Sequence, residues 1–389
     1  MILKQSKRTI TKIFIFCYLF IIHCSNDQVS KIWPTNGWKE SPAKTQGMNY
    51  DSLSAFSEIL ESGTLGYIDG MLIIKNGMIV FEKKYNNNYD SLYKSTNTPP
   101  GKYNYYDSNW HPYYKNSDLH TMQSASKSFT SAAIGVALKK NLLPDIEESI
   151  MDYFEDYRSA TPNRLRNEMT IKNVLTMTTG IRWDESSMPY TDPISNCVQM
   201  ESSTDWVQYV IDQPMLYKPG DEFEYNSGAT MLLSYIIEKV SGKDLSEFLE
   251  VNLFNILGIK DYYWKHTPKG LTDAEGGLYL TPRDLAKFGY LYLNKGNWNG
   301  KQILPVDWVE RTINNSIDTA WPNFKYSFQW WLMPYGDGQT ALLASGLGGQ
   351  RMIILTQYNI VAVFTGWNVY NIPSLNSWMA MNKIINALK

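Results

Sequence analysis

Short aromatic or β-branched runs in the last fifth of the chain constrain its fold more than any other feature. Glycine, proline and asparagine separate these runs, a pattern typical of an antiparallel sheet. The pair Asn76-Gly77 lies within residues 69–84 and predicts a hairpin, which would join the same sheet. The other expected strands are 328–333, 341–344, 351–357 and 360–365, and a closing helix is expected near 374–388.

The middle of the chain has a helical period instead. Residues 124–143 are rich in Ala, Ile, Val and Leu, with polar residues at the start, which predicts a helix buried on all sides. Helical segments inserted between two halves of one sheet predict an α+β fold, an antiparallel sheet flanked by helices with a mostly helical inserted subdomain. Further helices are expected near 53–60, at 171–178 before Gly180, at 205–212, and at 230–240 before Gly242.

Residues 85–118 contain eight tyrosines among Asn, Ser, Pro and Lys and have little aliphatic content. This composition predicts a long loop or an inserted lobe rather than part of the core. Loops of this length often border an active site, and a solvated surface excursion is the equally weighted alternative.

Composition excludes several functional classes. The 389 residues are 43% hydrophobic and 19% charged, so the chain can bury a large core. A formal charge of −2 gives no electrostatic footprint for nucleic acid, and we expect no nucleic-acid partner. The four histidines have no metal-ligand spacing and the three cysteines form no zinc motif, so we expect neither a metal nor another cofactor.

The first 23 residues differ from the rest. Four basic residues precede an apolar run over 13–22 that is too short to span a bilayer, which predicts a signal peptide over residues 1–23. Cys24 follows this run as in a bacterial lipoprotein cleavage site, although His23 replaces the usual small residue. We therefore expect export to the cell envelope with lipidation at Cys24, or otherwise a periplasmic or secreted protein. Residues 24–47 are interpreted as a tether, and 48–389 as the folded domain.

Ser124-Ala-Ser-Lys127 is the first motif with chemical meaning. Three residues along a helix place the lysine amine beside the serine hydroxyl. Burial would disfavour the charged amine, so Lys127 could accept the proton of Ser124. The start of a helix also favours an oxyanion. A helix cap with a surface lysine is the alternative for an isolated S-x-x-K motif.

A second segment, Phe-Glu-Tyr225-Asn-Ser227-Gly, supports the catalytic interpretation. Together the two motifs resemble the serine hydrolase family of class C β-lactamases, DD-peptidases and related esterases, and the resemblance runs from about residue 48 to the C-terminus. Residues 175–183 and 205–215 add to it. It implies that Tyr225 acts as general base or proton shuttle. Ser227 is implied as a substrate-binding residue, and its Y-x-S form resembles the 6-aminohexanoate-dimer hydrolase branch, which acts on linear amides and esters.

The third element, Ala344-Ser345-Gly346-Leu347, aligns with the strand that carries K-T-G or H-x-G in that family. Ser345 and Gly346 would contact substrate, and the backbone N–H groups of Leu347 and Ser124 would form the oxyanion hole. Ala344 supplies neither a cation nor an imidazole. The absence of a basic side chain at this position argues against recognition of the substrate carboxylate in penicillins and peptidoglycan stem peptides.

The leading hypothesis is a serine hydrolase that cleaves a small amide or ester through an acyl-enzyme on Ser124, with Lys127 and Tyr225 transferring protons. A β-lactamase or DD-peptidase would use the same nucleophile and is the second hypothesis. The third is a non-catalytic envelope protein that binds through residues 85–118. Contact with a membrane is expected only through the signal or a lipid anchor.

Overall fold

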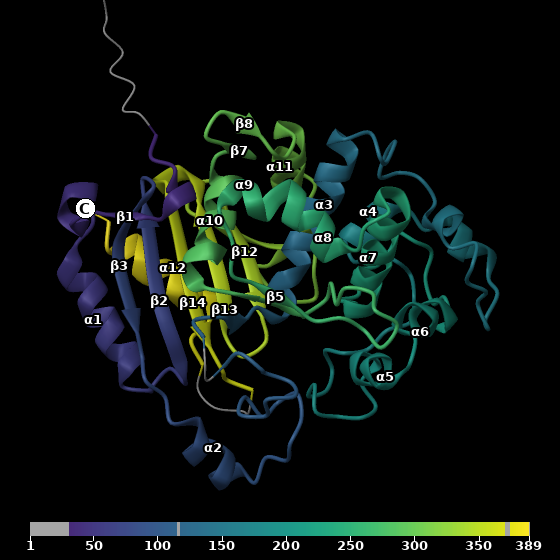
Figure 1. Ribbon diagram of the computed structural model, residues 1–389, viewed down its shortest axis with the longest axis horizontal. Helices are drawn as coiled ribbons and strands as arrows, with labels where there is room; N and C mark the ends of the chain where they lie inside the picture. The colour runs from purple at the N-terminus through teal and green to yellow at the C-terminus, as the bar shows by residue number, and fades with distance from the viewer. Residues whose placement is uncertain (1–30, 115–116, 370–373, 389) are drawn as a thin grey trace, which may run out of the picture. The chain divides into compact units, whose positions relative to one another are not determined.

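The computed structural model describes residues 31–114, 117–369 and 374–388, and Ile32–Lys389 form one compact unit. A nine-stranded sheet runs through this unit in the order β1-β3-β2-β14-β13-β12-β11-β10-β9 (Figure 1). The predicted hairpin, β2 (Ile68–Lys75) and β3 (Met78–Lys84), joins the C-terminal strands through the antiparallel pair β2 and β14. The C-terminal strands are β11 (Trp330–Tyr335), β12 (Gln339–Gly346), β13 (Gln350–Leu355) and β14 (Ile360–Gly366).

Helices cover both faces of the sheet (Figure 1). One face packs on α1 (Tyr50–Glu61) and α12 (Ser377–Asn386), with Phe56 and Ile384 in the shared apolar cluster. The other face packs on α10 (Pro282–Leu293), which in turn meets the helical region through a stacked pair of rings, Phe288 and Phe129, at 3.8 Å. The α+β fold predicted from the sequence is confirmed, with the sheet built from both ends of the chain.

The helical region centres on two long helices that pack together, α3 (Ser126–Lys139) and α7 (Ser227–Ser241). Gly242 ends α7 in the left-handed conformation, as the sequence predicts. The predicted helix over 171–178 is shorter, because α4 (Ile171–Leu175) ends before Met177, which has a positive φ of 57°. Helix α6 (Trp206–Asp212) is capped by Asp205, whose side chain accepts a hydrogen bond from the Gln208 N–H.

The remaining elements are short. The helices are α2 (Tyr89–Thr96), α5 (Asn196–Ser202), α8 (Leu245–Leu249), α9 (Asn255–Leu257) and α11 (Val306–Asn314). The strands are β1 (Lys39–Glu40), β4 (His120–Thr121), β5 (Tyr263–Trp264), β6 (Leu278–Leu280), β7 (Asn297–Trp298), β8 (Lys301–Gln302), β9 (Ile317–Asp318) and β10 (Lys325–Ser327). Single turns of 3-10 or π type are η1 (Pro34–Asn36), η2 (Ala43–Gln46), η3 (Gln123–Ala125), η4 (Ile150–Tyr153), η5 (Arg164–Glu168), η6 (Glu250–Phe254) and η7 (Thr356–Tyr358).

The tether predicted over residues 24–47 is wrong from Ile32 onward. Strand β1 pairs in parallel with β3, and Trp33 packs on Tyr290 and Trp298 with ring centroids 5.6 and 5.4 Å away. Aromatic residues within this polar stretch pack the segment against the folded domain. The overall composition of the stretch does not reveal these contacts. The predicted signal peptide and the predicted lipidation of Cys24 lie outside the described residues. No helix in the described part of the chain combines the length and the apolarity needed to cross a membrane.

The tyrosine-rich segment 85–118 is also more ordered than the sequence predicts. It contains α2, and three of its tyrosines bury their rings together with Trp367 from the segment after β14. Tyr105 stacks on Trp367 at 4.6 Å, while the Tyr89 hydroxyl donates to Asp69 at 2.8 Å. A cluster of aromatic rings, joined by Leu92, therefore forms a small core here.

Candidate active site

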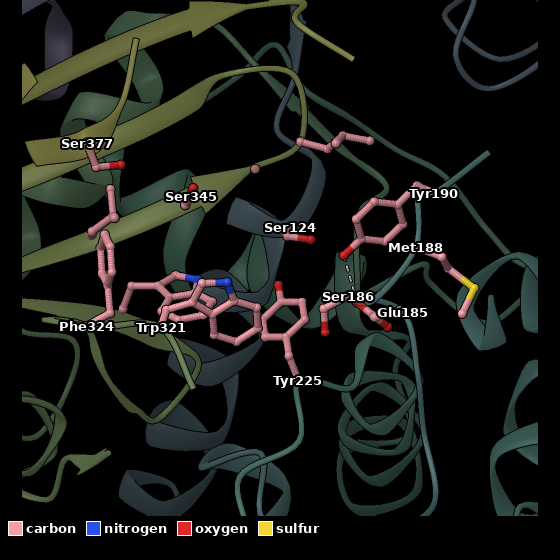
Figure 2. A pocket seen from close by; sticks show the side chains of 14 residues that line it. Ser124, Glu185, Ser186, Met188, Tyr190, Tyr225, Trp321, Phe324, Ser345 and Ser377 are labelled. Atoms are coloured by element: carbon pink, nitrogen blue, oxygen red, sulfur yellow. Dashed lines mark hydrogen bonds between the residues drawn. The ribbon is translucent and has the colours of Figure 1, made fainter. Parts of the chain in front are cut away.

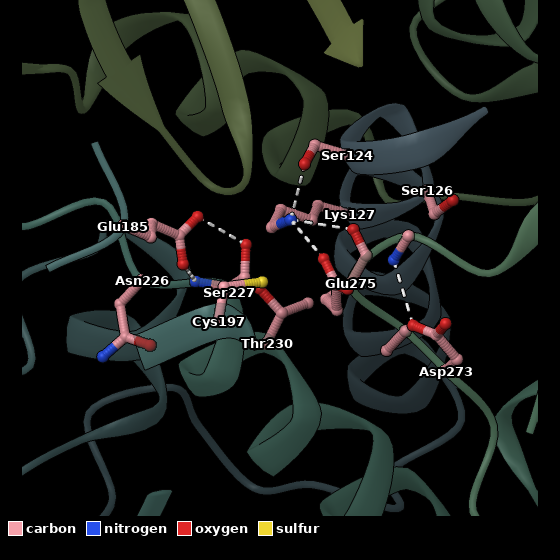
Figure 3. A network of polar contacts seen from close by, with 12 residues as sticks. Ser124, Ser126, Lys127, Glu185, Cys197, Asn226, Ser227, Thr230, Asp273 and Glu275 are labelled. Atoms are coloured by element: carbon pink, nitrogen blue, oxygen red, sulfur yellow. Dashed lines mark hydrogen bonds and ion pairs between the residues drawn. The ribbon is translucent and has the colours of Figure 1, made fainter. Parts of the chain in front are cut away.

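Ser124 lies in η3, immediately before α3, and is partly exposed, whereas residues 126–137 of α3 are buried. The Lys127 Nζ donates to the Ser124 Oγ at 2.9 Å, as the three-residue spacing predicts (Figure 3). The same amine donates to the backbone carbonyl of Glu275 at 2.7 Å and lies 3.3 Å from its carboxylate. Lys127 is fully buried, so its three hydrogen-bond partners fix the direction of the amine toward the serine.

The prediction that burial makes Lys127 a neutral base is wrong in direction. Burial alone lowers the pKa of Lys127, but the neighbouring Tyr225 hydroxyl and Glu275 carboxylate outweigh burial and raise the pKa above its usual value. The sequence analysis missed Glu275, which comes from the loop between β5 and β6, 148 residues from Lys127. At rest the amine is therefore an ammonium that is paired with a buried carboxylate.

Glu275 belongs to a buried cluster that continues behind Lys127. Its carboxyl group is hydrogen-bonded to that of Glu201, and Lys102 forms an ion pair with Glu201. Burial raises the pKa of Glu201 to about 8, whereas Lys127 and Lys102 overcome the effect of burial on Glu275 and lower its pKa to about 2. The two carboxyl groups thus share one proton, because two adjacent carboxylates repel each other.

This cluster is also the group of described residues that could hold a metal ion. Ligand atoms of Cys197, Glu201 and Glu275 all lie within 4.8 Å of one another. The ammonium groups of Lys102 and Lys127 already pair with the two carboxylates, so positive charge is supplied at the place a metal would take. Burial also raises the pKa of the Cys197 thiol, which disfavours the thiolate that a metal requires. The donor set fits an ion-pair network better than a metal centre.

Tyr225 comes from the loop before α7 and is also buried. Its ring stacks on Trp331 at 5.6 Å, and the Lys127 Nζ lies 5.4 Å from its centroid. Burial raises the pKa of Tyr225, while Lys127 and a hydrogen bond with Ser124 act in the opposite direction. The tyrosine is therefore a phenol at rest, with its hydroxyl directed at the nucleophile (Figure 2).

Ser227 does not lie where the resemblance implies. Its hydroxyl donates to the Glu185 carboxylate at 2.7 Å and its N–H donates at 2.9 Å, and only 1% of the residue is exposed (Figure 3). Trp183 Nε1 and the Tyr190 hydroxyl complete four donors to Glu185. Ser227 thus holds Glu185, a carboxylate that was not predicted from the sequence, although it lies two residues after the segment 175–183. Substrate binding by Ser227 is a prediction that this geometry does not support.

The end of β12 and the turn after it form the opposite edge of the site. Ser345, Gly346 and Leu347 line the same cleft as Ser124, as predicted. A Cβ atom on Gly346 would lie 2.1 Å from the Met122 carbonyl oxygen, so only glycine lets β12 approach the segment before the nucleophile. The backbone of Leu347 is thereby brought to the cleft, and its N–H remains the predicted second donor of an oxyanion hole.

The cleft between these elements has a volume of about 400 Å³ (Figure 2). Aromatic rings of Trp321, Phe324 and Trp331 form its wall beside Tyr225, and Leu343 adds an aliphatic surface. Glu185, Ser186, Met188 and Tyr190 lie on the other side of Ser124 from Ser377. The tyrosine-rich segment contacts residues 185–190 through the Tyr103 hydroxyl, which donates to the Tyr190 carbonyl. The segment therefore supports the cleft without lining it.

Comparisons with known proteins agree with this arrangement. The Beta-lactamase family model matches residues 71–371. The 6-aminohexanoate-dimer hydrolase of Paenarthrobacter ureafaciens is 25% identical over 255 residues, which cover 60% of this chain and 62% of that enzyme. The match thus spans less than two thirds of the length of that relative.

Solved structures have the same fold. A candidate 6-aminohexanoate-dimer hydrolase from Bacillus anthracis superposes with a TM-score of 0.69 at 22% identity, over 92% of this chain and 88% of the other. The D-amino acid amidase of Ochrobactrum anthropi superposes with a TM-score of 0.60 at 18% identity, over 87% and 98%. The fold is that of β-lactamases and penicillin-binding proteins, and this chain belongs to the beta-lactamase family.

Proposed function

We propose that this protein is a serine hydrolase that cleaves an ester or amide bond through an acyl-enzyme on Ser124. The observation that carries the proposal is the buried Lys127 amine 2.9 Å from the Ser124 hydroxyl at the edge of an aromatic cleft. A helix cap with a surface lysine would leave the amine in water, whereas Lys127 is 1% exposed. Burying an ammonium is costly, and its position beside the Ser124 hydroxyl gives this buried charge a chemical use.

Proton transfer follows from the charges around the serine. The resting pair is the Lys127 ammonium and the Tyr225 phenol, and loss of one proton from this pair leaves a base next to the Ser124 hydroxyl. The base takes the hydroxyl proton as the serine oxygen attacks the carbonyl carbon. The backbone N–H groups of Ser124 and Leu347 stabilise the resulting oxyanion. When the bond to the leaving group breaks, Tyr225 returns the proton to the departing oxygen or nitrogen.

The second half of the reaction repeats these steps with water. Water gives a proton to the Tyr225 and Lys127 pair as it attacks the acyl carbonyl, and Ser124 recovers its proton when the acid product leaves. The aromatic wall of the cleft favours substrates with an apolar chain or ring. The named hydrolase relative acts on a dimer of 6-aminohexanoate, and a linear amide or ester is the substrate class proposed here.

Intact-mass spectrometry after exposure to a fluorophosphonate tests the nucleophile without a known substrate. We expect one adduct on the wild-type protein and none on Ser124→Ala. Ser187→Ala is the matched control, because Ser187 is an exposed serine whose hydroxyl donates to Asp184. This variant should keep the adduct. A folded wild-type protein that forms no adduct would instead favour the non-catalytic binding scaffold.

A further inference from the structure

Lys102 brings a positive charge from the tyrosine-rich segment to the buried cluster behind the nucleophile. Its ammonium forms an ion pair with the Glu201 carboxylate, and both side chains are largely buried. Burial alone lowers the pKa of Lys102, but Glu201 and Glu275 outweigh burial and raise it well above its usual value. Lys102 is therefore an ammonium at neutral pH, and the chemistry proposed above gives this charge no task.

Hydrogen bonds fix the backbone at this position. Burial lowers the pKa of His111 to about 3, so its imidazole is neutral, and its Nε2–H donates to the Lys102 carbonyl at 2.7 Å. The next residue, Tyr103, accepts a hydrogen bond on its carbonyl from the Trp367 indole at 3.3 Å. Its hydroxyl donates to the Tyr190 carbonyl. The segment thus holds the Lys102 ammonium in a fixed place.

A continuous chain of contacts joins Lys102 to the nucleophile. Its partner Glu201 is hydrogen-bonded to the carboxyl group of Glu275. The Glu275 carboxylate lies 3.3 Å from the Lys127 Nζ, and this amine donates to the Ser124 Oγ at 2.9 Å (Figure 3). The charge of Lys102 therefore reaches Lys127 through two carboxyl groups.

Lys102 lies outside the cleft that contains Ser124. Together with Glu201 and Glu275 it lines a second cavity of about 310 Å³. None of the described residues that line this cavity also lines the cleft. An effect of Lys102 on the reaction must therefore pass through the buried cluster rather than through contact with substrate.

The net charge of the cluster shows what Lys102 contributes. At neutral pH Lys102 and Lys127 carry two positive charges, while Glu201 and Glu275 share one proton and carry one negative charge. When the Lys127 and Tyr225 pair loses one proton to become a base, the cluster passes from one positive charge to none. Without Lys102 the same loss would leave an uncompensated negative charge in a buried site, which is the more costly change.

The other titratable and charged groups around the cluster are the same with and without Lys102. These groups are Glu185 and Tyr225 beside Lys127, Cys197 beside Glu201, Tyr103 beside Lys102, and Asp273, Lys265 and His266 in the second cavity. Burial raises the pKa of Asp273 to about 6 and lowers that of Lys265 to about 8, so these two groups carry opposite charges at neutral pH. The difference of one charge therefore remains.

We propose that Lys102 is a positioning residue of the hydrolase. It holds the Glu201 and Glu275 carboxyl groups behind Lys127 and supplies the positive charge that lets the Lys127 and Tyr225 pair lose a proton. The tyrosine-rich segment thereby acts on the nucleophile without lining the cleft. This inference rests on the proposed hydrolase function and adds a residue that controls its base.

The rate constant of fluorophosphonate labelling tests this role. Unlike the final extent of labelling, the rate constant does not depend on the fraction of folded protein in a preparation. Lys102→Met removes the charge and keeps an unbranched side chain, whereas Lys102→Arg keeps the charge. Lys172→Met is the matched control, because Lys172 pairs with Glu147 at the surface at 2.8 Å.

Near pH 7 we expect Lys102→Met to be labelled about tenfold more slowly than the wild type, which corresponds to about one unit in the pKa of the base. Burial raises the pKa of Glu201 to about 8, so above this pH the wild-type cluster loses the shared proton and becomes neutral at rest, as in Lys102→Met. The two rate constants should therefore converge near pH 9. Near pH 7, Lys102→Arg should keep most of the wild-type rate and Lys172→Met should keep all of it.

Two results would overturn the inference while the proposed function stands. One is a wild-type protein that is labelled near pH 7 no faster than Lys102→Met. The other is a deficit in Lys102→Met of the same size near pH 7 and near pH 9, which a merely structural defect would produce. A folded wild-type protein that is not labelled at either pH would contradict the proposed function itself, and this inference with it.

Discussion

Replacing Glu275 with glutamine removes the negative charge that keeps Lys127 protonated. The two charged groups lie 3.3 Å apart, a separation at which unit charges attract by about 5 kcal/mol at an effective dielectric constant of about 20. Glu201 then loses its carboxylate neighbour, ionises more readily and returns part of the negative charge. We therefore expect the pKa of Lys127 to fall by about 1 to 2 pH units. This is less than the fall that loss of the whole attraction between the two charges would cause.

This change should be visible in the pH dependence of the nucleophile. The Lys127 and Tyr225 pair must lose one proton before it can act as a base, so the rate of fluorophosphonate labelling rises with pH. In Glu275→Gln the rising limb should move to lower pH by about the same 1 to 2 units. Glu310→Gln is the matched control, because Glu310 pairs with Lys295 in solvent at 2.9 Å. If the labelling rate of Glu275→Gln rises at the same pH as that of the wild type, or if the control shifts by the same amount, the reasoning is refuted.

The same variant has a second signature in folding. The pKa of the Glu275 carboxyl is lowered from 4.5 to about 2 in the folded protein. Its ionised form therefore contributes stability that is present above pH 4.5 and is lost as the pH falls through about 2. Denaturant unfolding at a series of acidic pH values should show this loss in the wild type and a smaller loss in Glu275→Gln.

Two further variants separate chemistry from support. Tyr225→Phe keeps the stack on Trp331 but removes the hydroxyl, so kcat for a p-nitrophenyl ester should fall by about 10² to 10⁴ while KM changes little; an unchanged kcat would remove Tyr225 from the mechanism. Ser227→Ala takes a hydrogen bond from the buried Glu185 carboxylate and should lower the free energy of unfolding in urea by about 1 to 3 kcal/mol. Native stability with a raised KM would instead return Ser227 to substrate binding.

Local patterns predicted those parts of the fold and site that depend on near neighbours in the chain. Short aromatic or β-branched runs separated by Gly, Pro and Asn identified the four C-terminal strands, and Asn76-Gly77 identified the hairpin, whose two turn residues both have positive φ. The contact between Ser124 and Lys127 follows from a spacing of three along a helix. Even here the boundaries differ: β11 begins at Trp330 because Phe328 and Gln329 have positive φ and break the strand.

Other features had a signal that composition conceals. Helix α10 begins with Thr281 as N-cap, followed by a proline at the first helical position and an acidic residue that the cap engages. This is a recognisable helix start in the sequence. The low aliphatic content of the tyrosine-rich segment predicts a long loop or an inserted lobe, yet its rings bury one another against Trp367. Because few residues form such a core, its sequence cannot be distinguished from that of a polar surface loop.

The charges around the nucleophile could not be predicted from local sequence. Glu275, Glu201 and Glu185 lie in three separate segments without periodicity, and each reaches the site only when the sheet and helices have assembled. The pKa of Lys127 illustrates the consequence, because burial alone would lower it, whereas Tyr225 and the distant Glu275 carboxylate raise it.

The same reasoning applies to substrate charge. The sequence pattern places the family's cation at position 344, and the alanine there argues against an anionic substrate. Directly paired residues on β12 and β13 place their side chains on a common face of the sheet, so position 344 alone does not fix the charge near the cleft. A motif specifies which residue reacts, since the reacting atoms must lie within a few ångströms along one helix. The charge of the substrate depends on the whole lining of the cleft, so it must be inferred from the assembled structure.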